Sequence, residues 1–306
     1  MQSKYIVVTH EPRIFYQTAD PFWNPVRNGF RKAAAEAQQD FLYLSPEKDC
    51  LNYNNESIYK TMENLVNGAL KQKPKAIVVS NPNRFIETGG MEKIVKSGTT
   101  IVSINAYSDV HYNEKGMLCH VGMCDNLCGK VMGKKLAEKS VNCILYLLSH
   151  GTTSGAIRRD ACQQELPAHT KTYEVVIDKL GSEHGVQQII QACKAHPEID
   201  AVVATNPTIG DMFSESRRRL DHESGGSRPY HFIQSDISET GLHEVLAGRA
   251  LAIIDQQPFL QGYLALKLAY LYKEHGVTPC GFIQTGPCVI NKDNAQDVLR
   301  KLGQIR

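Results

Sequence analysis

The side chains best suited to bind a small molecule stand in the segments that follow short apolar stretches of the chain. Six of them carry a directional polar group and two are aromatic: Asp20, Asn105, Arg159, Asn206, Asp236 and Gln256, with Phe22 and Trp23 beside the first. Carboxylate, amide and guanidinium groups form hydrogen bonds in fixed directions, which suits the many hydroxyls of a neutral polyol. The C–H faces of such a molecule pack on flat aromatic rings. These residue types therefore indicate a binding site for a sugar or a related polyol.

The same residue types also have a purely structural use. Asp and Asn are preferred as helix N-caps and as turn residues, so each of them alone could serve only to start a helix. The binding interpretation is favoured because six such positions follow apolar stretches, and because aromatic residues stand beside Asp20.

The elements that must position these residues are apolar runs that alternate with amphipathic stretches. The pattern predicts strands over residues 5–8, 41–44, 76–79, 100–104, 118–121, 143–148, 173–177, 201–204, 231–233 and 252–254. It predicts helices over residues 22–38, 56–72, 86–97, 125–139, 154–166, 185–196, 209–220, 239–247 and 261–274. Continuous apolar strands that alternate with helices are typical of parallel sheets covered on both faces.

About ten such strand–helix units are too many for one small open sheet. We therefore predict an α/β protein with two doubly wound parallel-sheet (Rossmann-like) lobes, and a closed eight-stranded barrel is the competing architecture. Ligands of open parallel sheets bind at the carboxyl ends of the strands. Both walls of the predicted site would then consist of the residues that follow the strands.

Length, charge and cysteine content bear on the number of domains, on the kinds of partner and on the location of the protein. The 306 residues suffice for two domains, and 34 basic against 32 acidic residues give no strong field that would attract nucleic acid. The nine cysteines are an odd number without the spacing of a metal site, so we expect buried structural thiols and no bound metal. The apolar segment at the N-terminus is too short for a signal peptide, so either the protein is cytosolic or a leader has been removed.

Several stretches of the chain together resemble a known family. They are Asp20-Pro21-Phe22-Trp23 with Gly29-Phe30 after it, the segment HVGMCDNLCGK at 120–130, and, in the same order as in the family, residues 201–206, 232–236 and 252–258. The sequence is similar to the type I periplasmic solute-binding proteins of the ribose- and galactose-binding kind. It is also similar to the ligand-binding halves of lactose-repressor-type regulators.

The resemblance implies two lobes joined by three hinge crossovers, with a ligand trapped between them. The first lobe would comprise residues 1–119 and 257–285, and the second residues 120–256 and 286–306. Asp20, Phe22 and Trp23 would line the first wall, and Asn105 falls at a further polar contact of the family. Arg159 falls at the arginine that clamps the ligand, with Arg158 as the substitute if the alignment shifts by one. The remaining polar contacts would be Asn206, Asp236 and Gln256.

Three hypotheses for the function follow from these observations. The first is a non-catalytic, monomeric solute-binding protein in the periplasm that delivers a sugar or polyol to an ABC-type permease or a membrane sensor. The second is the cytoplasmic sugar-sensing domain of a lactose-repressor-type regulator that lacks its DNA-binding head. The third is an enzyme, but the sequence contains no GxGxxG after the first strand, no GxxxxGK[ST] and no GxSxG. We therefore expect no catalysis, no cofactor and no nucleic-acid partner.

Overall fold

The chain forms two compact units in the computed structural model, which describes residues 5–11, 20–46, 55–80, 90–105, 116–150, 153–279 and 281–306. Unit 1 comprises Met1–Cys124, Gln257–Thr285 and Gly303–Arg306, and unit 2 comprises Asp125–Gln256 and Gly286–Leu302. The chain thus passes between the units at Cys124–Asp125, Gln256–Gln257 and Thr285–Gly286, and a fourth time at Leu302–Gly303, one passage more than the three expected.

Two boundaries differ from those expected. The first unit extends to Cys124, not to residue 119, because strand β5 (Cys119–Met123) pairs in parallel with β4 (Thr100–Ile104) of the same sheet. The last residues, Gly303–Arg306, return to unit 1 instead of ending in unit 2. Within unit 1 the Asn28 side chain donates a hydrogen bond to the Gln304 carbonyl oxygen over 2.9 Å.

The sheet of unit 1 has the strand order β11-β5-β4-β3-β1-β2. Its remaining strands are β1 (Tyr5–Val8), β2 (Phe41–Leu44), β3 (Ala76–Ser80) and β11 (Phe282–Gly286). β1 pairs in parallel with both β2 and β3, and β3 pairs in parallel with β4. β2 therefore lies on one side of β1 and β3 lies on the other. Because the strand order reverses direction there, the gap between β1 and β3 is a topological switch point.

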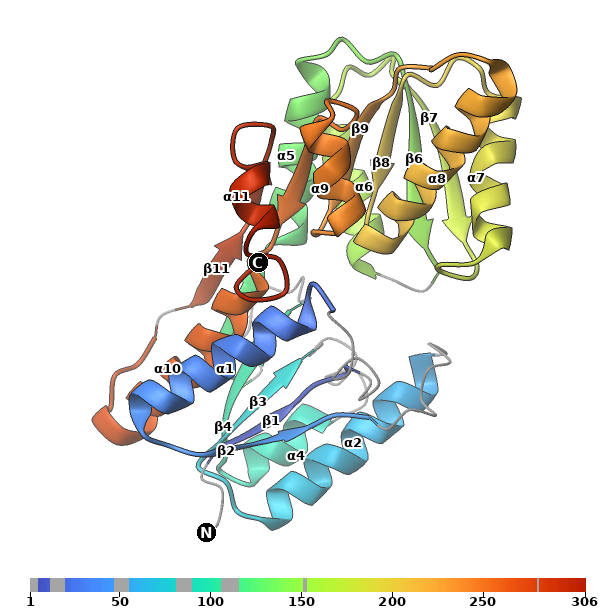
Figure 1. Ribbon diagram of the computed structural model, residues 1–306. Helices are drawn as coiled ribbons and strands as arrows, with labels where there is room; N and C mark the ends of the chain where they lie inside the picture. Colours follow the sequence, from blue (N-terminus) through green and yellow to red (C-terminus); the bar gives the residue numbers. More distant parts are fainter. Residues whose placement is uncertain are drawn as a thin grey trace. The chain divides into compact units, whose positions relative to one another are not determined.

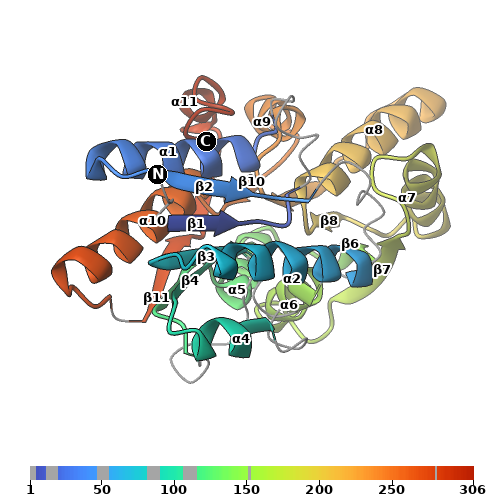
Figure 2. The same cartoon turned by 90° about the horizontal axis from the view of Figure 1, so that it is seen from below.

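Helices cover both faces of this sheet. α1 (Trp23–Ala37) and α10 (Pro258–His275) are far apart in sequence but pack side by side on one face, as Figures 1 and 2 show. α2 (Asn55–Lys71) and α4 (Gly90–Lys96) cover the other face. Strand residues alternate between the two cores, so Tyr5 and Val7 face α1 while Ile6 and Val8 face α2.

The sheet of unit 2 repeats this order, as β12-β10-β9-β8-β6-β7. Its strands are β6 (Cys143–Ser149), β7 (Lys171–Ile177), β8 (Ala201–Ala204), β9 (His231–Ser235), β10 (Ala252–Asp255) and the antiparallel edge strand β12 (Cys288–Ile290). The pairings among β6 to β10 are parallel. The switch point of this sheet accordingly lies between β6 and β8.

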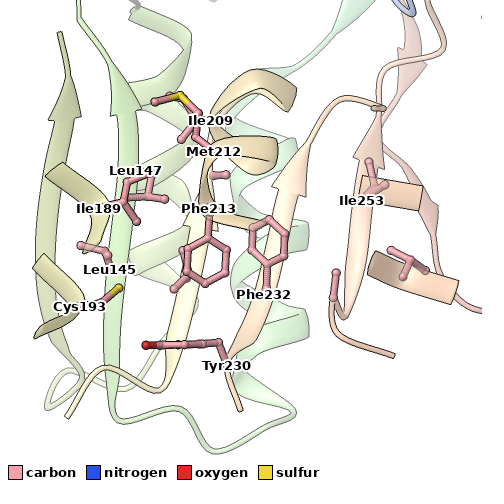
Figure 3. Packing of buried hydrophobic residues seen from close by; sticks show 14 of the residues in the cluster. Leu145, Leu147, Ile189, Cys193, Ile209, Met212, Phe213, Tyr230, Phe232 and Ile253 are labelled. Atoms are coloured by element: carbon pink, nitrogen blue, oxygen red, sulfur yellow. The ribbon is translucent and has the colours of Figure 1, made fainter. Parts of the chain in front are cut away.

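One face of this sheet is covered by α5 (Asp125–Ala137) and α6 (Thr153–Gln164), which pack on each other. The other face carries α7 (Glu183–Ala195), α8 (Pro207–Ser224), α9 (Glu239–Leu246) and α11 (Ala295–Leu299). Figure 3 shows the core beneath these helices, where Phe213 of α8 contacts Phe232 of β9 at 4.8 Å between ring centroids. Two open sheets, each with its own core, confirm the predicted two-lobed α/β class and exclude the barrel.

The prediction of buried thiols agrees with Cys119, Cys128, Cys143, Cys162 and Cys193, which are buried and free, while Cys124 and Cys288 are free and half-buried. Among the described residues, no group of three or more potential ligands could hold a metal ion. No described helix combines the length and the apolar character that crossing a bilayer demands.

Candidate functional site

The most highly connected polar group at the carboxyl ends of the unit 2 strands is the guanidinium of Arg158. Its Nε donates to Asp125 Oδ1 over 2.7 Å, and its Nη1 donates to the Thr205 carbonyl oxygen over 2.9 Å. Nη1 also lies 2.7 Å from Ser235 Oγ and 3.5 Å from Asp236 Oδ2. One side chain thus links the start of α5 to the residues at the ends of β8 and β9.

The close packing of α5 on α6 brings Arg158 to this position. A Cβ at Gly129 of α5 would collide with the Arg158 carbonyl oxygen and with the Ala161 side chain. Only glycine lets the two backbones approach this closely. Because Asp125 is the first residue of α5, the same approach brings its carboxylate within reach of the Arg158 guanidinium.

Two carboxylates balance the buried charge of Arg158, which is 5% exposed. Burial alone would lower the pKa of this guanidinium, but the carboxylates of Asp125 and Asp236 outweigh that effect and raise its pKa above the ordinary value. Burial also raises the pKa of the Asp236 carboxyl, against the opposing attraction of Arg158 and the hydrogen bond from Gln256. Gln256 Nε2 donates that bond to Asp236 Oδ1 over 2.7 Å.

Three of the predicted residues in unit 2 therefore stand at the ends of neighbouring strands, and two of them are in contact. Asp236 and Gln256 follow β9 and β10 and are hydrogen-bonded to each other. Asn206 follows β8 and caps α8, because its Oδ1 accepts a hydrogen bond from the Ile209 N–H over 2.9 Å. Its side-chain amide nitrogen makes no hydrogen bond to the described residues, so capping uses only half of this side chain.

The structure does not bring Arg159 into this group. Arg159 lies on the outer side of α6, where Nε donates to Asp160 over 2.8 Å and Nη1 pairs with Glu174 of β7. Successive helical residues point about 100° apart, so only one of two adjacent arginines can face the strand ends. Arg158, the substitute considered in the sequence analysis, is the one that does.

In unit 1 the predicted residues Asp20, Phe22 and Trp23 form one group at the start of α1. Asp20 Oδ1 accepts hydrogen bonds from the backbone N–H groups of Phe22 and Trp23, over 3.0 and 2.6 Å. Burial raises the pKa of the Asp20 carboxyl, although these two bonds lower it. The Phe22 and Trp23 rings meet edge to face at 5.0 Å between centroids.

The two aromatic rings have different surroundings. Trp23 is only 7% exposed and belongs to the core of unit 1, whereas Phe22 is half-buried at the rim of that core. Phe22 is thus the ring with the larger face available to a ligand. The Trp23 ring contributes by supporting its neighbours.

Asn105 follows β4 and is half-buried, with φ +74°, a left-handed backbone conformation that asparagine tolerates better than most residues. Asp236 has the corresponding position after β9 in unit 2 and a similar φ of +67°. β4 and β9 occupy corresponding places in the two sheets. Each of them is followed by a predicted polar residue in the left-handed conformation.

Sequence reasoning missed two residues of unit 1, His10 and Ser80. His10 follows β1, and its Nδ1 lies 2.7 Å from Oγ of Ser80, the last residue of β3. The His10 ring also meets the Trp23 ring edge to face at 5.0 Å. His10 stands only two residues beyond the apolar run 5–8, so its place at the end of a strand is visible in the sequence.

A buried ionic network adjoins this group. Glu11 is fully buried, pairs with Arg27 and accepts a hydrogen bond from the Tyr43 hydroxyl over 2.7 Å. A cavity of about 360 Å³ opens between α1 and β2, and Arg27, Tyr43 and Phe41 are among the residues that line it. Since Glu11 already balances the charge of Arg27, we assign this network a structural role in fixing the end of β1 against α1 and β2.

Two α/β units, each with polar side chains gathered at the carboxyl ends of its strands, define a protein that binds small molecules and is built from a duplicated doubly wound fold. The chain matches the family model described as "Periplasmic binding protein domain" over residues 14–276, and it therefore belongs to this family. A curated relative is the xylose/arabinose-binding protein XylF of Sulfolobus acidocaldarius, which is 24% identical over 94% of this chain and 72% of its own length.

Solved structures share the fold at lower identity. A carbohydrate transporter protein of Acidothermus cellulolyticus, in complex with myo-inositol, is 22% identical with a TM-score of 0.78, over 97% of this chain and 96% of its own. A periplasmic ribose ABC transporter protein of Conexibacter woesei is 17% identical with a TM-score of 0.78, over 97% and 95%. A solute-binding protein of Agrobacterium radiobacter with D-arabinose is 18% identical with a TM-score of 0.76, over the full length of both chains.

Proposed function

We propose that this protein is a non-catalytic solute-binding protein for a neutral sugar or polyol, which it delivers to an ABC-type permease. Its membership of the periplasmic binding protein family supports this function. Similar proteins are described as binding or transporting xylose and arabinose, ribose, or as complexed with myo-inositol, all of them neutral polyhydroxylated molecules. These similarities favour a transport protein over the repressor-type sensing domain, and they favour a location outside the cytoplasmic membrane.

The observation that carries the proposal is the state of the Arg158 guanidinium. Nε and Nη1 are held by Asp125, Thr205, Ser235 and Asp236, whereas Nη2 makes no hydrogen bond to any described residue. An arginine that is 5% exposed and held by four partners keeps the two N–H donors of Nη2 in a set direction. Such preorganised donors suit a ligand oxygen, because little side-chain entropy is lost on binding.

The charges around Arg158 favour a neutral ligand. Asp125 and Asp236 already outnumber the single positive charge of Arg158. A sugar phosphate or a sugar acid would be repelled by these two carboxylates. A hydroxyl group can instead donate to a carboxylate and accept from Nη2 at the same time.

Isothermal titration calorimetry tests the proposal on purified protein from which bound ligand has been removed by unfolding and refolding. The panel consists of D-xylose, L-arabinose, D-ribose, D-galactose and myo-inositol, with D-glucuronate and D-ribose 5-phosphate as anionic controls. We expect at least one neutral compound to bind with a Kd of about 10 μM or below, and both anions to bind at least about 100-fold more weakly. Binding of the anions alone, or of no compound, would refute the proposal.

A further inference from the structure

His10 lies at the switch point of the unit 1 sheet, where ligands of open α/β sheets bind. It follows β1, and Ser80, its hydrogen-bond partner, ends β3. β1 and β3 are neighbours in the sheet, with Val8 paired opposite Val79. The corresponding switch point of unit 2, between β6 and β8, includes Thr205, to which Arg158 donates.

The hydrogen bonds of Ser80 determine which ring nitrogen of His10 carries the proton. Ser80 Oγ accepts a hydrogen bond from the His10 backbone N–H over 2.9 Å. Its hydroxyl proton has one acceptor among the described residues, His10 Nδ1 at 2.7 Å. Nδ1 therefore accepts a hydrogen bond, and in the neutral ring the proton must reside on Nε2.

The surroundings keep the His10 ring neutral and fixed. Burial lowers its pKa to about 4. The ring packs at 85° on the Trp23 ring, and Ser80 holds the opposite end. Nε2 makes no hydrogen bond to any described residue, and His10 is only half-buried. A neutral N–H donor of fixed direction, without a partner in the described part of the chain, thus stands beside Trp23.

We propose that His10 Nε2–H donates a hydrogen bond to an oxygen of the ligand, and that Ser80 is the positioning residue that fixes this tautomer. This inference rests on the proposed sugar-binding function and adds a contact that the sequence analysis did not include. Because Nε2–H only donates, the ligand must present an acceptor there, either a hydroxyl or a ring oxygen. A ligand with an ammonium group at that place would be rejected, because the ammonium group and Nε2–H are both hydrogen-bond donors.

The variant His10→Phe tests the contact, because phenylalanine keeps a ring against Trp23 but has no donor. The matched control is His275→Phe, since His275 of α10 meets Tyr270 edge to face at 5.5 Å and 75° in the same unit. Calorimetry with the neutral sugars that bind the wild-type protein should show about tenfold weaker binding by His10→Phe and unchanged binding by His275→Phe. His10→Gln, which restores an N–H donor, should recover part of the loss.

The role of Ser80 is tested separately with Ser80→Ala, by ¹⁵N NMR of the histidine rings. The wild-type protein should show a protonated Nε2 and an unprotonated Nδ1 for His10, whereas the variant should show a mixture of tautomers and bind the sugar several-fold more weakly. If the wild-type protein binds a sugar and His10→Phe binds it equally well, the inference is wrong while the proposed function stands. If the wild-type protein binds no neutral sugar, both fail together.

Discussion

The adjacent arginines 158 and 159 differ in role because a helix turns about 100° per residue. Arg158 faces α5 and the strand ends, where two carboxylates and two oxygen acceptors surround it. Arg159 faces outward and forms ion pairs with Asp160 and Glu174, which remain partly exposed. The sequence alone could place an arginine at this site only to within one residue, since the phase of α6 depends on its packing against α5.

Replacing each arginine by methionine should separate the two roles. Arg158→Met leaves Asp125 and Asp236 buried without a cation, and we expect the free energy of unfolding to fall by about 3–5 kcal/mol. Arg159→Met breaks only partly exposed pairs and should cost about 1 kcal/mol or less. Urea unfolding followed by circular dichroism measures both values. Equal losses in the two variants would contradict the assignment of Arg158 as the buried partner of Asp125 and Asp236.

For other predicted residues, the sequence indicates which side chains lie at strand ends or helix starts, but not what each side chain does there. Asp20 and Asn206 both accept hydrogen bonds from backbone N–H groups at the start of a helix, which is the structural use that Asp and Asn commonly have. Each of them uses only one side-chain atom for this purpose. Trp23 was expected on the binding wall, but it is buried in the core of unit 1. Burial of this kind depends on how α1 docks on the sheet, and no local sequence pattern contains that information.

At the level of elements, the position of Arg158 depends on one helix pair. Gly129 and Gly133 of α5 face the carbonyl oxygens of Arg158 and Cys162 of α6, and a Cβ at either glycine would overlap with them. The spacing of four residues places both glycines on one face of α5. The two helices can therefore approach closely along more than one turn.

Alanine substitution should have opposite effects at two helical glycines. Gly129→Ala forces α5 and α6 apart and should destabilise the protein by about 1–3 kcal/mol, with weaker sugar binding because Arg158 moves relative to Asp125. Gly68→Ala in α2 meets open space and should stabilise the protein by about 0.5–1 kcal/mol. Thermal unfolding of both variants measures the difference. A Gly129→Ala protein as stable as the wild type would show that the close approach of α5 to α6 at Gly129 is not needed for stability.

The alternation of apolar runs with amphipathic stretches predicted most elements to within a few residues, because the central parallel strands are buried on both faces and form uninterrupted apolar runs. The strands β11 and β12 were missed, since their residues are mostly half-buried and the strands are short, with only Pro287 between them. β7 was predicted too short, because it is an edge strand whose first residues, Lys171 and Thr172, are exposed and polar. Sequence periodicity therefore predicts central strands better than edge strands.

At the scale of the whole molecule, the two units differ in how they can be observed. The chain contains a single tryptophan, Trp23, and it is buried in unit 1. His10, which contacts Trp23, and the fully buried His120 of β5 belong to the same unit. Burial lowers the pKa of His10 to about 4 and that of His120 to about 3. Tryptophan fluorescence thus reports on the unit that contains both groups.

These pKa values make the stability of unit 1 depend on pH in a defined direction. A histidine with a lowered pKa stays neutral in the folded state and takes up a proton on unfolding below pH ~6.5. Its contribution to stability is therefore complete above that pH and is lost progressively as the pH falls toward 4. Between about pH 7.5 and about pH 5.5, the two histidines together should lower the free energy of unfolding of unit 1 by about 3 kcal/mol.

Urea unfolding at these two pH values, followed by fluorescence and by circular dichroism, tests this expectation. The fluorescence midpoint should fall on acidification, and it should fall further than the circular dichroism midpoint, since the latter averages both units. His120→Gln removes one of the two titrating groups and should reduce the fluorescence shift by about half. His275→Gln, at the end of α10, should leave the shift unchanged. A fluorescence midpoint independent of pH would mean that His10 and His120 are accessible to protons in folded unit 1, and the neutral donor assigned to His10 would then be wrong.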